Sequence, residues 1–384
     1  MRSRLWTRAA LLLAAPLMLN TACSSDDAGT PQPEPDAGAG DVTGDTVVED
    51  DGSGMADVEP EVLLGTDQTI VALEDAHVFW TGWDEGQNAR EVENRVTMPS
   101  ADELYSQIEM TFALSCPDGS CDPWDRLGSF GVVTDIDTDD EQYIEISRFI
   151  TPYAVGAEWT IDVTDLRPLL ADRVDFRVFI DTWVGPGSRF GNGWSVDVSF
   201  DFVGGEPEKT VLGVIPVWSM QRVNYGDPLQ PVADQISSNG VDLPEGTRTA
   251  ALRTFITGHG QGNNDNCAEF CPREHTFVAG GVNYSRDVWR DDCETSSAPN
   301  QQGTFQYPRA GWCPGAVTHD WTIDLGDVGL FLSLDYDVEA YENTCRPDSA
   351  DCSGCALGNG CEWNDSNHTE PNYQITALVI AYGE

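Results

Sequence analysis

From residue 63 to the end of the chain, apolar side chains recur at alternate positions far more often than at helical spacing. The alternation is clearest at residues 128–133, 143–149, 172–183, 194–202, 211–218 and 373–382. Successive side chains of a β-strand point to opposite faces of its sheet, so this pattern indicates strands with one buried face. The 37 glycines and 22 prolines interrupt the chain too often for long helices. We therefore predict an all-β fold of antiparallel sandwiches, with residues 163–170 as the one short helical segment.

The length of the chain and one run of chain-breaking residues predict two domains. The 384 residues exceed a typical domain of about 150 residues. Residues 204–208 read Gly-Gly-Glu-Pro-Glu and fall between two predicted strands, which is typical of a linker. We therefore place the first domain at residues 63–205 and the second at residues 206–384.

The first 22 residues have the pattern of an export signal peptide. Arg2, Arg4 and Arg8 supply a basic start, residues 9–19 are apolar, and small residues precede Cys23. The apolar run is too short to anchor the chain across a bilayer. Cleavage before Cys23 would leave an N-terminal cysteine, as in bacterial lipoproteins. We expect an exported lipoprotein of the cell surface or outer membrane, lipidated at Cys23, with secretion as the alternative.

Residues 23–62 differ in composition from the rest of the chain. They contain no aromatic residue, no lysine and no arginine, and they are rich in Asp, Gly, Pro and Ala. Such a segment buries too little apolar surface to offset the entropy lost on ordering. We predict a disordered acidic tether.

The charge of the chain excludes several classes of partner. There are 65 acidic and 20 basic residues, a formal net charge of −45, and Lys209 is the sole lysine. Nucleic-acid binding depends on clustered cationic side chains, so we expect no nucleic-acid partner. The same negative field repels anionic membranes, so membrane association would occur through a lipid anchor only. Neutral ligands are the natural candidates.

The cysteine count agrees with export. Setting Cys23 aside, ten of the 11 cysteines are left, an even number consistent with five disulfides in an oxidising compartment. Zinc is an alternative for the group Cys345, Cys352, Cys355 and Cys361, but two disulfides are the better interpretation in an exported chain. Four cysteines allow three pairings, and the sequence does not choose among them. The histidines never occur at ligand spacing, so we expect no metal and no cofactor.

The stretch at residues 116–126 carries the first candidate chemistry. Cys116 and Cys121 are separated by four residues and can close a small loop, after which Trp124, Asp125 and Arg126 follow directly. An indole, a carboxylate and a guanidinium side by side can hold a sugar-like ligand and perform acid–base work. The structural alternative is a salt bridge at a strand end over a packed ring.

A second short cystine loop repeats this design. Cys267 and Cys271 flank Glu269 and follow a segment rich in glycine and asparagine at residues 258–266. Both loops would immobilise a carboxylate, as preorganised catalysis requires. The alternative is that each disulfide only staples a long loop.

Two further stretches combine an aromatic ring with a charge. Arg309 precedes Trp312 by three residues, and Asp181 precedes Trp183 by two at the end of a predicted strand. Residues two apart on a strand share one face, so Asp181 and Trp183 would lie together. A ring beside a carboxylate suits the apolar face and the hydroxyls of a pyranose, although Trp183 could equally belong to the core.

Together these stretches resemble the bacterial peptide-N-glycosidase F family, which removes asparagine-linked glycans from glycoproteins. Order, spacing and residue type agree in both predicted domains. The matching runs are residues 116–126, 148–153, 161–165, 181–183, 267–271 and 309–315.

The resemblance implies a fold and a reaction. It implies two eight-stranded antiparallel jelly rolls side by side, with the active site between them. It also implies a hydrolase that cleaves the amide between asparagine and the first N-acetylglucosamine, releasing the glycan and leaving aspartate. The expected partners are N-glycosylated proteins or glycopeptides, and the expected state is a monomer.

The resemblance also implies roles for individual residues. Asp125 matches the essential catalytic aspartate, and Glu269 matches a glutamate that acts through bound water. Asp181 is the third expected catalytic carboxylate and stands where the family usually has glutamate. The expected substrate-binding residues are Trp124, Arg126, Trp183, Arg309 and Trp312. The implied disulfides are Cys116–Cys121, Cys267–Cys271 and Cys293–Cys313.

The chemistry of the residues is compatible with these roles. An amide is cleaved when a carboxylate activates water, cations stabilise the developing oxyanion and an acid protonates the departing nitrogen. We expect Asp125 to act as base or proton shuttle and Glu269 to position the water. Paired carboxylates could also hydrolyse a sugar–sugar bond. Because Asp181 is one methylene shorter than glutamate, a catalytically impaired glycan-binding module of the same fold is the alternative function.

Overall fold

The computed structural model describes residues 63–82, 88–136, 138–227, 229–261, 267–343, 355–356, 360–361 and 370–384. The predicted signal peptide, the lipidation site Cys23 and the predicted tether lie outside the described residues. Cys345 and Cys352 lie outside them too, and the strands β18 (Cys355–Ala356) and β19 (Gly360–Cys361) are described only as backbone. The pairing of these four cysteines therefore stays a prediction.

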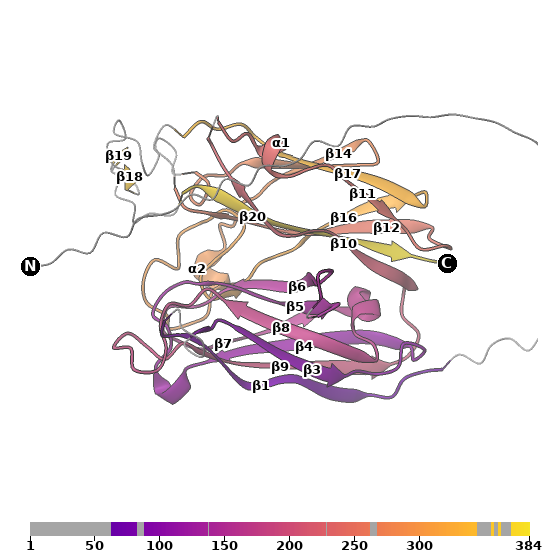
Figure 1. Cartoon of the computed structure of the whole chain (residues 1–384), viewed down its shortest axis with the longest axis horizontal. Coiled ribbons are helices and arrows are strands. Elements are labelled where there is room, and N and C mark those ends of the chain that lie inside the picture. Colours follow the sequence, from indigo (N-terminus) through magenta and orange to yellow (C-terminus); the bar gives the residue numbers. More distant parts are fainter. Residues whose placement is uncertain are drawn as a thin grey trace, which may run out of the picture. The chain divides into compact units, whose positions relative to one another are not determined.

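The N-terminal sandwich consists of two sheets of five strands each (Figure 1). Its first sheet has the order β2-β1-β9-β4-β7 and its second the order β15-β6-β5-β8-β3, and all these neighbours pair antiparallel. The first sheet contains β1 (Gln68–Trp80), β2 (Asn88–Ala89), β4 (Tyr105–Ser115), β7 (Ala157–Asp162) and β9 (Trp194–Gly204). The second contains β3 (Glu91–Thr97), β5 (Leu127–Thr134), β6 (Gln142–Ile150), β8 (Arg173–Ile180) and β15 (Ala316–Val317).

The C-terminal sandwich consists of two four-stranded antiparallel sheets. The sheet that faces the N-terminal sandwich has the order β10-β20-β12-β16, and the outer sheet has the order β11-β17-β13-β14 (Figure 1). The inner sheet contains β10 (Val211–Asn224), β12 (Thr249–His259), β16 (Trp321–Asp327) and β20 (Asn372–Tyr382). The outer sheet contains β11 (Asn239–Asp242), β13 (Glu274–Ala279), β14 (Val282–Asp287) and β17 (Phe331–Val338).

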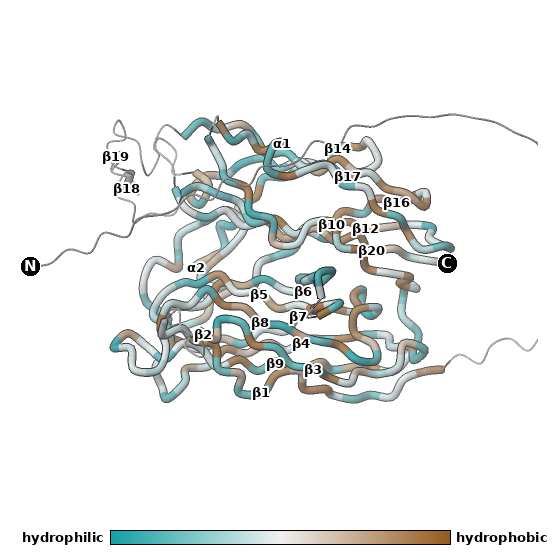
Figure 2. Tube along the Cα trace, viewed as in Figure 1, coloured by the Kyte–Doolittle hydropathy of each residue, from teal (hydrophilic) through white to brown (hydrophobic). Residues whose placement is uncertain are grey.

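The alternation of the sequence explains these strands. Along β8, Val174, Phe176, Val178 and Ile180 are buried while the residues between them are partly exposed. Hydrophobic and hydrophilic positions follow one another along the strands in the same way (Figure 2). Removal of such side chains from water is the main driving force for stacking two sheets. The predicted all-β, antiparallel fold is confirmed.

Helical structure is confined to segments of three to six residues in the described part of the chain. The predicted helical segment at residues 163–170 is confirmed as the 3-10 turn η2 (Thr164–Leu169). The others are η1 (Pro117–Gly119), α1 (Val232–Gln235) and α2 (Cys293–Ser296).

The two sandwiches share part of one apolar core. Five buried residues of the inner C-terminal sheet belong to the same apolar cluster as the N-terminal core, namely Val214, Ala251, Leu378, Ile380 and Tyr382. Sheet membership changes between Gly204 at the end of β9 and Val211 at the start of β10. The exact domain limits at residues 205 and 206 stay a prediction.

One segment crosses from the C-terminal half into the N-terminal sheet. In β15, Ala316 and Val317 pair with Ile150 and Phe149 at the edge of β6. The amides of Gly315 and Thr318 add hydrogen bonds of 2.9 and 2.8 Å to carbonyls of β6. The chain between β14 and β15 is thereby tied to the N-terminal sandwich, next to the residues that follow β6.

Candidate active site

The first cystine loop is fixed by a buried aspartate that directly follows it. The Cys116–Cys121 disulfide closes the loop, and the carboxylate of Asp122 is fully buried. Asp122 accepts hydrogen bonds from the Trp124 amide at 3.0 Å, Arg126 Nε at 3.1 Å and Thr182 Oγ1 at 2.7 Å. Asp122 therefore holds the turn that presents Asp125. The sequence prediction gave Asp122 no role, although an acid directly after a cystine loop was an available signal.

Asp125 lies on this turn and contacts residues from both sandwiches. Its Oδ2 accepts a hydrogen bond of 2.7 Å from the Tyr153 hydroxyl and lies 4.0 Å from Nη2 of Arg309. Burial raises the pKa of Asp125 above its usual value, and the hydrogen bond from Tyr153 and the charge of Arg309 oppose that rise. A raised pKa makes a carboxylate a better proton acceptor, which suits a role in acid–base chemistry.

Glu269 is held inside the second cystine loop. The Cys267–Cys271 disulfide closes this loop, and Glu269 Oε2 accepts a 3.1 Å hydrogen bond from the Gly260 amide. Its Oε1 accepts a 3.4 Å hydrogen bond from Arg309 Nε. Burial raises the pKa of Glu269, the charge of Arg309 lowers it and the negative charge of Asp125 raises it, and the resulting pKa is about 7. Glu269 can thus gain or lose a proton near neutral pH.

Arg309 joins the two carboxylates. Its side chain is 2% exposed and lies between Asp125 at 4.0 Å and Glu269 at 3.4 Å. Its Nη1 donates to the carbonyls of Thr304 and Tyr307, at 3.1 and 3.0 Å. A guanidinium with this many hydrogen bonds is held rigidly, so the separation of the two carboxylates is fixed.

Trp312 lies behind Arg309 rather than on the surface. The Arg309 guanidinium sits 4.8 Å from the Trp312 ring centroid, and the indole Nε1 donates a 2.7 Å hydrogen bond to the Gly258 carbonyl. Trp312 is 3% exposed. Because Trp312 is buried against the guanidinium, it supports Arg309. The sequence predicted a substrate contact instead. The Cys293–Cys313 disulfide follows directly, so all three implied pairings are present.

Tyr153 and Thr304 complete this group and were not predicted as site residues. The Tyr153 hydroxyl lies 3.3 Å from Thr304 Oγ1, in addition to its hydrogen bond to Asp125. Burial and the charge of Asp125 raise the pKa of Tyr153 above its usual value, which keeps the phenol protonated as a donor. Tyr153 follows β6, which pairs with the strand that begins after Arg126, so the two predicted strands at residues 128–133 and 143–149 were the available signal.

Asp181 belongs to a second, more exposed group. Arg90 Nη1 donates a 2.8 Å hydrogen bond to Asp181, and its guanidinium sits 4.5 Å from the Trp183 ring centroid. Trp80 contacts the same ring at 5.2 Å. Partial burial raises the pKa of Asp181, while the charges of Arg90 and Arg126 and a hydrogen bond with Trp183 oppose the rise. The β8 strand ends at Ile180, so Asp181 and Trp183 meet in the loop after the strand rather than on it.

Arg126 connects the two groups electrostatically. Its charge lowers the pKa of both Asp125 and Asp181, so it lies near both carboxylates. Its Nε is held by Asp122 at 3.1 Å. The predicted residues Asp125, Glu269, Arg309, Arg126, Asp181 and Trp183 are therefore gathered in one region, as two neighbouring groups.

A pocket opens over Asp125. Its volume is about 580 Å³, within the usual range for small-molecule sites. The N-terminal sandwich contributes Trp124, Asp125 and Tyr153, and Gly303 and Thr304 come from the chain before β15. Trp124 is 51% exposed, so one face of its ring is open to a ligand.

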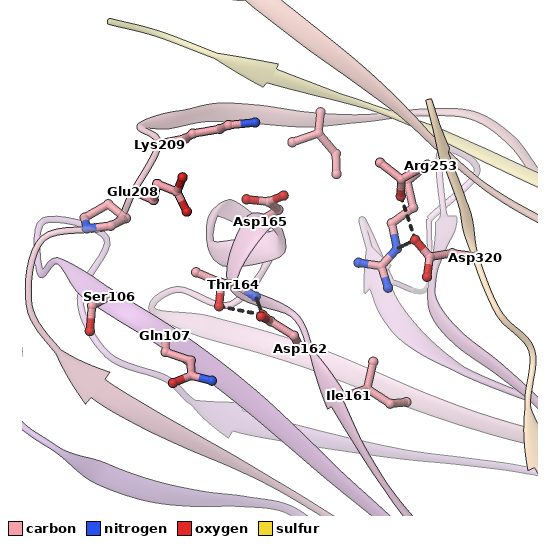
Figure 3. Close-up of a pocket in the computed structure, with 13 residues that line it drawn as sticks. Ser106, Gln107, Ile161, Asp162, Thr164, Asp165, Glu208, Lys209, Arg253 and Asp320 are labelled. Carbon is pink, nitrogen blue, oxygen red and sulfur yellow. Dashed lines mark hydrogen bonds and ion pairs between the residues drawn. The ribbon is translucent and has the colours of Figure 1, made fainter. Parts of the chain in front are cut away.

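A larger pocket of about 660 Å³ lies elsewhere between the sandwiches, near the linker (Figure 3). It is lined by Ser106 at the start of β4, whereas the cystine loop that precedes Asp125 follows the end of β4. The two pockets share no lining residue. The ion pair of Arg253 and Asp320, at 3.5 Å, lies in its wall (Figure 3). None of the predicted site residues lines this pocket.

Within the described ranges, no cluster of three or more His, Cys, Asp or Glu side chains is placed to hold a metal ion. No helix in the described part of the chain is long and apolar enough to cross a membrane.

Comparison with protein families gives two matches. A family described as "Peptide-N-glycosidase F, N terminal" matches residues 136–190, and one described as "Peptide-N-glycosidase F, C terminal" matches residues 230–339. The two matches cover parts of both sandwiches, including Asp181, Glu269 and Arg309.

Individual relatives agree with these matches. The chain is 30% identical over 270 residues to the peptide-N(4)-(N-acetyl-beta-D-glucosaminyl)asparagine amidase F of Elizabethkingia miricola, covering 66% of this chain and 74% of that protein. The crystal structure of PNGase F, a glycosylasparaginase from Flavobacterium meningosepticum, superposes with a TM-score of 0.66 at 26% identity. That match covers 83% of this chain and 96% of the other. PNGF-II shares the fold with a TM-score of 0.58 at 16% identity, covering 82% of this chain and 65% of that one.

Proposed function

The chain belongs to the peptide-N-glycosidase F family, whose fold is a pair of jelly rolls, and from this premise we propose that it is a glycoasparagine amidase. The reaction would be hydrolysis of the amide between asparagine and the first N-acetylglucosamine of an N-linked glycan. The observation that carries the proposal is the bridge in which Arg309 lies 4.0 Å from Asp125 and 3.4 Å from Glu269. This bridge joins one carboxylate from each sandwich beside a pocket open to solvent.

In this proposal the two carboxylates have different roles toward the attacking water. Glu269, in its ionised form, would orient a water molecule for attack on the amide carbon. Asp125 would accept the proton of that water and return it to the departing nitrogen. The Tyr153 hydroxyl, 2.7 Å from Asp125, favours the charged form before the transfer and fixes which oxygen faces the substrate.

Positive charge would stabilise the oxyanion that develops on the amide carbonyl. Arg309 is engaged by Glu269 and by carbonyls of its own loop, so its main effect is to position the carboxylates. Arg126 is the cation whose charge reaches both Asp125 and Asp181. We therefore propose that Arg126 stabilises the oxyanion.

The exposed side chains around Asp125 would bind the glycan. Trp124 offers an open ring to the apolar face of a sugar, and Asp181 offers a carboxylate to its hydroxyls. Trp183 is already stacked on one side by Arg90, so it would contact a sugar with its remaining edge. Trp312 would act only through Arg309.

The expected substrates are N-glycosylated proteins or glycopeptides met outside the cytoplasm. The three disulfides are consistent with an oxidising compartment. We retain export as a surface lipoprotein, or as a secreted monomer, as part of the proposal.

The test is incubation of the purified protein with a denatured N-glycoprotein, followed by mass spectrometry of the peptides and the released sugars. Release of intact glycan together with conversion of the linked asparagine to aspartate is the expected result. Glycan release that leaves one N-acetylglucosamine on the asparagine would instead indicate cleavage of a sugar–sugar bond. Asp125→Asn should lower the rate by about 1,000-fold or more without changing the thermal unfolding transition.

One observation favours a second candidate, a glycan-binding module with impaired catalysis. The shorter Asp181 is committed to Arg90, and Arg90 covers part of Trp183. Measurable glycan affinity with no product in the mass-spectrometric assay would support that candidate over the amidase.

A further inference from the structure

A fully buried ion pair lies at the interface of the two sandwiches. Glu145 and Arg148, both on β6, have 0% exposed side chains. Arg148 Nε donates to Glu145 Oε1 at 2.9 Å and Nη2 donates to Oε2 at 2.7 Å, which is a bidentate pair. Such a pair is unusual in a core because both charges lose their hydration.

The guanidinium of this pair also reaches across the interface. Arg148 Nη1 donates to the Gln374 carbonyl at 2.7 Å and to Thr257 Oγ1 at 3.1 Å. Its Nη2 donates to Thr376 Oγ1 at 3.0 Å. One side chain of the N-terminal sandwich thus holds β12 and β20 of the C-terminal sandwich at once.

From Arg148, β6 leads directly to Asp125. Thr151 follows the strand, and its hydroxyl accepts the Arg126 amide at 2.8 Å and donates to the Trp124 carbonyl at 2.9 Å. These two bonds hold the backbone of the residues directly before and after Asp125. Tyr153, two residues further on, provides the hydrogen bond to the Asp125 carboxylate.

From the same Arg148, β12 leads to Glu269. The hydroxyl of Thr257 lies 2.8 Å from Nε2 of His259 at the end of β12. The next amide, of Gly260, donates to the Glu269 carboxylate at 3.1 Å. Arg148 is therefore linked to Asp125 through β6 and to Glu269 through β12.

The other end of the interface has a different character. Leu378, Ile380 and Tyr382 of β20 pack into the apolar cluster of the N-terminal core, near the pocket shown in Figure 3. There, Tyr382 donates a 2.8 Å hydrogen bond to Asp165 of η2. Apolar contact is non-directional and tolerates sliding, whereas a bidentate pair with fixed acceptors tolerates little.

We propose that the Glu145–Arg148 pair is the positioning element of the active site, setting the register of the two sandwiches so that Asp125 and Glu269 meet on Arg309. This inference rests on the proposed amidase function for its kinetic consequence. Neither residue contacts the pocket over Asp125, so both act through the strands that carry other residues. A misplacement of about 1 Å between reacting groups is enough to lower a rate about 100-fold.

The main test replaces the whole pair with apolar side chains of similar size, in the variant E145L/R148M of the full chain. Exchange of a complete buried pair is far better tolerated than removal of one partner, which leaves a buried charge. We expect kcat to fall about 10- to 100-fold while KM changes less than about twofold, because the proposed glycan contacts lie mainly within the N-terminal sandwich. Arg148→Lys, which keeps the charge but loses the bidentate geometry, should give an intermediate kcat and serves if the double variant does not fold.

Tyr382→Phe is the matched control. It removes one hydrogen bond between the sandwiches at the apolar end of the interface, and we expect kcat within about twofold of wild type. A stably folded double variant with wild-type kcat would overturn the proposal. So would a loss of kcat in Tyr382→Phe equal to that of the pair variants, because the effect would then belong to the interface in general.

A second measurement separates this inference from the proposed function. The segment that crosses from the C-terminal half to the edge of β6 donates its Thr318 and Gly315 amides to the carbonyls of Arg148 and Ile150, at 2.8 and 2.9 Å. The hydrogen exchange of these two amides should accelerate in the pair variants, while exchange within β5 and β8 should not change. Unchanged exchange at Gly315 and Thr318 would overturn the positioning role even in a protein that shows no amidase activity.

Discussion

The groups around Asp125 and Asp181 use the same residue types, a carboxylate, an arginine and an aromatic ring, in opposite ways. Asp125 meets Tyr153 of its own sandwich and Arg309 of the other, and a 2% exposed guanidinium fixes its distance from Glu269. Asp181 is paired with Arg90 of the same sandwich, and its side chain is 45% exposed.

Under the proposed function, this difference would separate a group that transfers protons from a group that binds the glycan. A buried carboxylate has a raised pKa and can change its charge near neutral pH, as Glu269 does at about 7. Partial burial also raises the pKa of Asp181, but the charge of Arg90 opposes that rise, and this more exposed carboxylate can accept hydrogen bonds from a sugar. In the proposed function, catalysis belongs to the group assembled from both sandwiches and glycan recognition to the group built within one.

The strongest test of this division compares Glu269→Gln with Asp181→Asn. We expect Glu269→Gln to lower kcat about 100- to 1,000-fold with little effect on KM, because glutamine holds the water without the negative charge. Asp181→Asn should act mainly on KM, raising it about tenfold. Steady-state kinetics on one fluorescent glycopeptide would measure both. Equal losses of kcat in the two variants would contradict the division.

Tyr153→Phe tests whether the hydrogen bond to Asp125 matters for the chemistry. Loss of a hydrogen bond to a charged group should lower kcat about tenfold or somewhat more and leave KM nearly unchanged. The same bond lowers the pKa of Asp125, so the variant should also need a higher pH for activity. Tyr143→Phe is a matched control, since Tyr143 bonds to Ser129 on the shared sheet away from Asp125. A pH–rate profile that Tyr153→Phe does not move would argue against the role.

The pH dependence of kcat/KM should follow Glu269. If the ionised carboxylate orients the water, activity is low when Glu269 is protonated and rises as pH passes its pKa of about 7. Between pH 6 and pH 8 we expect a rise of about tenfold, which Glu269→Gln should abolish. A fall of kcat/KM over the same interval would mean that protonated Glu269 acts as the acid.

The smallest expected effect is that of Asp181→Glu. The longer side chain moves the carboxylate by about 1.5 Å and disturbs the 2.8 Å bond to Arg90. We expect KM to rise about two- to fivefold with kcat within about twofold. A large gain in kcat would show instead that the short side chain of Asp181 limits catalysis.

The sequence was sufficient for the strands and for the cystine loops. Alternation predicted β5, β6, β9 and β20 close to their observed bounds, because a half-buried strand has a period of two wherever it lies. The prediction for β8 ran three residues too far, and the prediction for β10 missed its last six residues, where the register with β20 shifts. Short spacing between cysteines located the two loops that carry Asp125 and Glu269. Both signals are local, and local signals can be read from one sequence.

Partners that are distant along the chain could not be read in this way. Arg90 meets Asp181 from 91 residues away, and Tyr153 meets Thr304 from 151 residues away. Their pairing depends on strand register and on how the two sandwiches pack. The burial of Trp312 has the same origin, since a Trp beside an arginine looks alike in sequence whether it faces a ligand or lies beneath the guanidinium.

The β15 strand has a consequence for biosynthesis. During translation, β6 leaves the ribosome long before Ala316 and Val317 do. Until those two residues are made, the backbone groups at the outer edge of β6 are not paired with β15. Unpaired strand edges are the usual starting points of intermolecular association. The nascent chain is therefore most vulnerable to association between β6 and the arrival of β15. Over that interval a chaperone that covers strand edges would protect it best.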